Sequence, residues 1–145
     1  MSTIFSSFDI RGRLSDTLTP ENAWNVGKAF ADWLPNEGHI TVLSDTAAEP
    51  KIVSALIEGV RLQGRAVIDG GHGSIERLIQ IIADEPPAGS LYVSHDETQG
   101  LEVIQLYQND GVALSSDNGL IELGELVDAG NFVPSATKGD LTQLS

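Results

Sequence analysis

Short runs of β-branched and aliphatic residues alternate along this chain with longer stretches of helical apolar spacing, and this alternation limits the fold more than any other feature. Strand-like runs occupy Ile40–Leu43, Ala66–Asp69 and Ser90–Val93, while helical spacing fills Thr19–Leu34 and Pro50–Gln63. Strands that alternate with helices of this length are joined by right-handed crossovers and form a mostly parallel sheet. The pattern predicts an α/β fold, a three-layer α/β/α sandwich with a mostly parallel, mixed sheet.

Capping residues place the ends of the predicted helices. Thr19-Pro20-Glu21 offers a hydroxyl cap, a proline for the first turn and an acid at the positive end of the helix dipole. Ser74 is a second N-cap, and Pro86-Pro87 ends the helix that it begins. The remaining predicted elements are a turn at Gly70–Gly73, a strand at Leu101–Tyr107 that turns through Asn109–Gly111 towards Val112–Leu114, and a helix at Leu120–Ala129.

Length and composition limit the classes of protein. The 145 residues suit one domain, which we place at residues 1–133, with 134–145 as a loose tail or the start of a linker. A net charge of -13 disfavours nucleic acid and anionic membranes as partners, and the absence of cysteine excludes disulfides and thiolate metal sites. No apolar run approaches the roughly 20 residues that span a bilayer, so the sequence predicts a soluble, cytoplasmic protein.

Two short motifs carry the most specific functional signal. The chain opens with Phe8-Asp9-Ile10-Arg11-Gly12, and Ser94-His95 follows three alternations of strand and helix later. In this order the motifs resemble the first domain of the α-D-phosphohexomutases, the phosphomannomutase and phosphoglucomutase family. That family reads roughly Tyr-Asp-Ile-Arg-Gly near its N-terminus and Thr-Ala-Ser-His-Asn-Pro around a serine that carries a phosphoryl group. The resemblance covers nearly all of this chain and about the first third of a complete mutase.

The resemblance implies roles for four residues. Ser94 would carry the phosphoryl group and, as phosphoserine, hold Mg²⁺, while His95 would handle protons beside it. Arg11 would bind phosphate, with Asp9 to orient its guanidinium. The implied reaction is an isomerase-type intramolecular phosphoryl transfer on hexose phosphates in carbohydrate metabolism. The chain lacks domains two to four of the family, so we expect no activity from it alone.

Several positions depart from the family pattern. Asp96-Glu97 replaces Asn-Pro after the Ser-His pair and puts two carboxylates where a phosphoserine would sit. Ser44-Asp45-Thr46 replaces a Gly-Arg-Asp-x-Arg loop, and Gly73-Ser74-Ile75 replaces Pro-Thr-Pro. Arg11 itself also fits an ion pair with Asp9 or Asp16. At these loop positions the chain lacks cationic groups that the family has, whereas the apolar spacing of its helices and strands matches the predicted fold.

Alternatives to a phosphoserine domain therefore stay open. A diverged, non-catalytic relative would keep the fold for binding or assembly, with a partner chain or a second copy on the face that domain two covers in the family. A flavodoxin-like or receiver-like domain would use Asp45 or Asp69 as phosphoacceptor. A receiver also needs a lysine on its last strand-end loop, and none is evident in this sequence. Ser94 also fits a serine that caps its own loop. His72 and His95 lie on adjacent predicted loops and are a weak candidate for a zinc pair.

Overall fold

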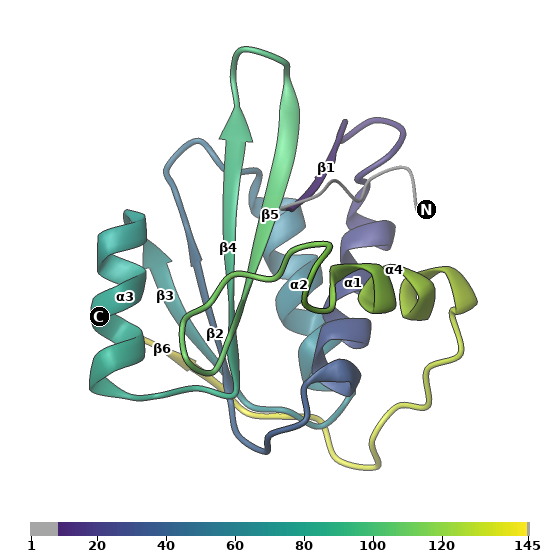
Figure 1. Cartoon of the computed structure of the whole chain (residues 1–145), viewed down its shortest axis with the longest axis vertical. Coiled ribbons are helices and arrows are strands. Elements are labelled where there is room, and N and C mark those ends of the chain that lie inside the picture. Colours follow the sequence, from purple (N-terminus) through teal and green to yellow (C-terminus); the bar gives the residue numbers. More distant parts are fainter. Residues whose placement is uncertain (1–8, 145) are drawn as a thin grey trace.

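A six-stranded mixed sheet forms the centre of the molecule in the computed structural model, which describes residues 9–144, so that Phe8 of the N-terminal motif lies outside the described residues. The strand order is β1-β5-β4-β2-β3-β6, in which β4, β2, β3 and β6 are parallel and β5 is antiparallel to both of its neighbours (Figure 1). The strands are β1 (Ile10–Gly12), β2 (Ile40–Ser44), β3 (Val67–His72), β4 (Gly89–Asp96), β5 (Leu101–Gln108) and β6 (Leu141–Gln143). The helices are α1 (Pro20–Trp33), α2 (Pro50–Leu62), α3 (Ile75–Asp84) and α4 (Leu120–Ala129).

Helices cover both faces of this sheet, which confirms the predicted three-layer α/β/α arrangement. Side chains from α1, α2 and α4 share one large apolar core with the sheet, and Phe30, Leu56 and Leu123 are fully buried there. The opposite face carries α3, which packs through Leu78 and Ile81 on a smaller cluster. The sheet is therefore closed by helices on both sides, and its strand ends are left to position functional side chains.

The helix boundaries follow the capping signals in the sequence. Thr19 Oγ1 accepts a hydrogen bond of 3.2 Å from the Asn22 amide, and Ser74 Oγ accepts one of 3.3 Å from the Arg77 amide, so both predicted N-caps are confirmed. The end of α1 is capped from a distance by Arg65. Its guanidinium donates to four backbone carbonyls at the end of α1 and in the loop after it, those of Ala31, Leu34, Asn36 and Gly38, over 2.7–3.1 Å.

Two glycines allow α1 and α2 to pack with their backbones in contact. A Cβ on Gly59 would collide with the carbonyl of Trp24, and one on Gly27 would come 2.5 Å from the carbonyl of Leu56. Glycine is therefore required at the crossing for steric reasons rather than for backbone flexibility.

Three segments differ from the sequence-based prediction. Strand β3 continues to His72, where a turn was expected from Gly70, and β4 continues through Ser94 to Asp96, where a loop was expected. Residues 141–143, which lie in the predicted loose tail, instead form β6 beside β3. Tertiary hydrogen bonds explain this strand: the Val67 amide donates to Asp140 O at 2.8 Å, and Arg61 Nε donates to Gly139 O at 2.8 Å. No helix among residues 9–144 has both the length and the apolarity to cross a bilayer.

Candidate functional site

The hairpin formed by β4 and β5, together with the short strand β1, carries the four residues that the family motifs single out. Ser94 on β4 and Arg11 on β1 both pair with Val103 of β5, one from each side. Residues paired across strands share a face of the sheet. The structure therefore brings Ser94 and Arg11 onto the same face, with one strand between them, and Ser94 is partly exposed there.

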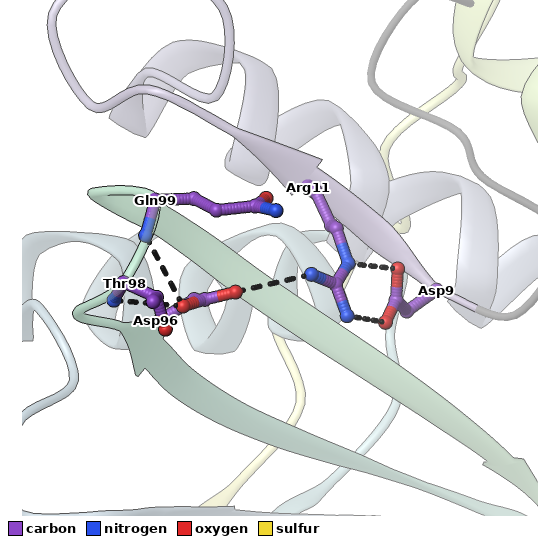
Figure 2. A network of polar contacts seen from close by, with 5 residues as sticks. All are labelled: Asp9, Arg11, Asp96, Thr98 and Gln99. Atoms are coloured by element: carbon purple, nitrogen blue, oxygen red, sulfur yellow. Dashed lines mark hydrogen bonds and ion pairs between the residues drawn. The ribbon is translucent and has the colours of Figure 1, made fainter.

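Arg11 is held between two carboxylates, as Figure 2 shows. Its Nε donates to Asp9 Oδ1 at 2.9 Å and its Nη2 to Asp9 Oδ2 at 3.1 Å, in a bidentate pair. Its Nη1 donates to Asp96 Oδ2 at 3.3 Å. Asp9 is buried, with 5% of its surface exposed, while the Arg11 side chain is 40% exposed. Asp9 thus orients the guanidinium, and Asp96 engages its Nη1.

The same Asp96 closes the hairpin. Its Oδ1 accepts hydrogen bonds from the amides of Thr98 at 3.0 Å and Gln99 at 3.3 Å. Hydrogen bonding from Thr98, assisted by the Gln99 and Thr98 amides and the Arg11 charge, holds the pKa of Asp96 below its ordinary value. Hydrogen bonding and charge from Asp9 raise the pKa of Arg11 further. Both groups are therefore ionised at neutral pH, and the pair is built into the turn.

His95 does not share the face on which Ser94 lies. Consecutive residues of a strand point to opposite sides of a sheet, so His95 faces the large core while Ser94 faces the side of α3. There His95 Nδ1 lies 2.7 Å from Oε2 of Glu102, its cross-strand partner on β5. The Glu102 side chain is only 6% exposed. Its other oxygen, Oε1, is buried and has no hydrogen-bond partner within residues 9–144.

The sequence-based reading missed Glu102 as a functional residue. The signal was present, because period-2 alternation along Leu101–Tyr107 puts Glu102 on the inward side with Ile104 and Leu106. A charged residue at an inward position requires a partner. The pairing of β4 with β5 places His95 directly opposite Glu102. The register became evident only once Ser94–Asp96 proved to be strand rather than loop.

The residues present do not fit a divalent metal ion at this hairpin. Among residues 9–144, no group of three or more His, Cys, Asp or Glu side chains is arranged to hold one. Asp96 is already engaged by Arg11 and two amides, and the Arg11 guanidinium brings a positive charge to the same place. The weak candidate zinc pair gains no support either, since His72 contacts Ser44 and His95 contacts Glu102.

Comparison with known proteins now decides the family. The family description "Phosphoglucomutase/phosphomannomutase, alpha/beta/alpha domain I" matches residues 2–128. This chain is domain I of the phosphoglucomutase/phosphomannomutase family. It is 27% identical over 147 residues to a phosphomannomutase of Salmonella typhimurium, covering 99% of this chain and 32% of that protein. It is 28% identical over 148 residues to a phosphomannomutase of Klebsiella pneumoniae, covering 99% of this chain and 93% of that sequence.

The fold of this phosphohexomutase domain is also found in solved structures. A phosphoglucomutase/phosphomannomutase family protein from Burkholderia thailandensis superposes with a TM-score of 0.84 at 22% identity. The match covers 100% of this chain and 33% of that one. The chain therefore spans about a third of the Salmonella and Burkholderia proteins. The resemblance drawn from the two motifs is confirmed at the level of family and fold.

Proposed function

We propose that this phosphohexomutase domain I acts as a binding domain and does not carry a phosphoryl group in a mutase reaction. The observation that carries this proposal is the state of Arg11. The Arg11 guanidinium, on the same face of the sheet as Ser94 with β5 between them, is already paired with both oxygens of Asp9 and one oxygen of Asp96. A phosphate would have to displace at least one of these carboxylates from the guanidinium before it could pair with Arg11.

Electrostatics gives the size of the obstacle. Ser94 and Asp96 are two residues apart on β4, roughly 7 Å along the strand, and two unit charges at that separation interact by about 2 kcal/mol at an effective dielectric of 20. A phosphoserine at Ser94 would bring about two negative charges to the face that holds Asp9 and Asp96. Phosphoryl transfer depends on cations that neutralise the developing charge, and the geometry of this hairpin opposes that requirement.

The separation of Ser94 from His95 bears on which group could accept a proton from the Ser94 hydroxyl. A general base must come within hydrogen-bond reach of the hydroxyl that it deprotonates. His95 is turned to the other face of β4 and bonded to buried Glu102. Ser94 and His95 remain candidate catalytic residues from the family motif, in which they are also consecutive; because Glu102 holds His95 on the other face of β4, we infer that His95 is not the base for the Ser94 hydroxyl.

A second candidate function is phosphoryl carriage by Ser94 within a larger assembly. The partial exposure of Ser94 and the position of Arg11 on the same face favour it. In that case a partner chain or further domains would supply the hexose phosphate site, Mg²⁺ and the remaining cationic groups. The reaction would take place in the cytoplasm. Arg11 would then have to exchange Asp96 for the phosphate.

The Arg11 side-chain signal in a ¹H–¹⁵N spectrum distinguishes the two functions. We expect the Nε–Hε resonance of Arg11 to stay in place when millimolar mannose 6-phosphate is added, because Asp9 and Asp96 occupy the guanidinium. Asp96→Asn is the matched control, since the amide keeps the acceptor oxygen for Thr98 and Gln99 but removes the charge; in this variant the resonance should move. A saturable shift in the wild-type chain contradicts the proposed function.

A further inference from the structure

We propose that Ser44 and His72, at the carboxyl ends of β2 and β3, form the centre of a binding site for a small uncharged ligand rich in hydroxyl groups, such as a free monosaccharide. This inference rests on the proposed function as a binding domain and gives that function a place and a ligand class. The site is separate from the Ser94 hairpin. It comprises side chains from two strand ends and the loops that follow them.

The topology of the sheet singles out this place. Strands β2 and β3 are adjacent and parallel, and the chain leaves them in opposite directions. After β2 it enters α2, which packs in the large core, and after β3 it enters α3 on the other face (Figure 1). In open α/β sheets, ligands bind outside the carboxyl ends of the strands at such a switch point, because the diverging loops leave a crevice there.

The local backbone is irregular at the same point. The pairing of β2 with β3 shifts register between Val42 and Ser44, so that Ser44 lies opposite His72. Gly71, just before His72, has φ +76°, and a Cβ placed there would meet no atom within 4 Å. A bulge re-aims the side chains next to it. Here it brings His72 Nδ1 to 3.2 Å from the buried Ser44 hydroxyl, which leaves the other imidazole nitrogen for a ligand.

Two pockets meet at His72. One, of about 180 Å³, is lined by Ser44, Asp69, Gly71 and His72 and by the first turns of α2. The other, of about 370 Å³, is lined by Asp45, Thr46, His72, Gly73, Ser74 and Tyr92. The second volume falls in the range of roughly 300–1,000 Å³ that is usual for small-molecule sites. Because His72 belongs to both linings, a ligand that contacts its imidazole has room on either side.

The chemistry of the linings selects the ligand class. No lysine or arginine lines either pocket, whereas each contains a carboxylate. Asp45 uses one oxygen to accept from the Ala47 amide at 2.8 Å, and Asp69 uses one to accept from the Gly71 amide at 2.9 Å. The second oxygen of each carboxylate is then available to accept a hydrogen bond from a ligand hydroxyl. A phosphate or carboxylate ligand would be repelled by both carboxylates. Each pocket has a single carboxylate among neutral hydroxyl-bearing side chains, Ser44 and Ser54 in one and Thr46, Ser74 and Tyr92 in the other, and this lining matches an uncharged hydroxyl-rich molecule.

A ¹H–¹⁵N titration of the full chain with D-mannose, D-glucose and myo-inositol tests this inference. We expect at least one of the three to shift the amides of Asp45, His72 and Gly73 in a saturable manner. Ser44→Ala and Asp45→Asn should each raise the Kd at least fivefold, whereas Ser116→Ala, at an exposed loop position, should leave it unchanged. The spectra report directly whether each variant is folded.

The inference is overturned by no saturable shift with any of the three molecules, by shifts confined to residues 94–102, or by equal binding of mannose 6-phosphate. Binding of glucosamine without binding of the uncharged sugars would identify a cation site instead and would also refute it. The outcome is independent of the hairpin. A phosphorylated Ser94 would end the proposed function even if a sugar binds at His72, and failure of sugar binding leaves the state of Ser94 as it is.

Discussion

Removal of His95 should reveal how much the buried carboxylate of Glu102 depends on it. Glu102 is 94% buried by side chain, Oε2 is bonded to His95 at 2.7 Å, and Oε1 has no partner among residues 9–144. A buried acceptor that is left without its hydrogen-bond partner costs roughly 1–3 kcal/mol, and more when it is charged. The His95 side chain is 28% exposed, so water can enter the space in His95→Ala. We therefore expect a loss of about 2–3 kcal/mol in the free energy of unfolding.

Urea denaturation followed by circular dichroism measures this loss in the free energy of unfolding. In thermal melting, the same loss corresponds to a fall in Tm of roughly 5–10 °C for a chain of this size. Glu102→Leu is the paired variant, since it replaces the carboxylate with an apolar group and leaves His95 partly solvated; we expect a change within about 1 kcal/mol. Glu97→Ala, on the exposed turn, is the control. The reasoning is refuted if His95→Ala is as stable as wild type, or if Glu102→Leu loses more stability than His95→Ala.

Three further predictions follow from the fold. Arg65→Ala should lower the free energy of unfolding by about 2 kcal/mol in urea, because four carbonyls lose a charged donor, and Arg65→Lys should restore only part. Gly59→Ala should cost about 2–3 kcal/mol, measured by thermal melting, since its Cβ meets the Trp24 carbonyl; an unchanged Tm would show that the helices separate easily. The pKa of Asp96 is lower in the folded chain than in the unfolded chain. The ionised Asp96 therefore stabilises the hairpin fully at a pH above the pKa of the unfolded chain, and this stabilisation is lost as the pH falls through the pKa of the folded chain. Amide protection at residues 97–100 should fall in that acidic range in wild type and change less in Asp96→Asn.

The sequence was sufficient to predict the elements whose signals are local. Apolar spacing and the caps at Thr19 and Ser74 located the helices, and the alternation of strand and helix determined the layers. The order of the Asp-Ile-Arg-Gly and Ser-His motifs identified the family, which the comparisons confirm. The predicted roles of Ser94, His95, Arg11 and Asp9 remain predictions.

What the sequence did not reveal depends on contacts between distant segments. Asp96 was read as a source of repulsion, whereas hairpin register also makes it a partner of Arg11, 85 residues away. The strand at Leu141–Gln143 is held in place because the Val67 amide and the Arg61 side chain donate hydrogen bonds to the backbone just before it. Neither residue type predicts such a contact from the sequence. The pairing of Ser44 with His72 requires a bulge in the sheet, which no short pattern encodes.

Phosphosite mapping is the most direct test of the central claim that this domain binds a ligand and does not transfer a phosphoryl group. The purified chain is incubated with glucose 1,6-bisphosphate and Mg²⁺, and its intact mass and peptides are compared with those of Ser94→Ala. Because Asp9 and Asp96 surround Arg11, the account predicts an unchanged mass for both proteins. One added phosphoryl group on wild type, absent from Ser94→Ala and located on Ser94, would contradict it.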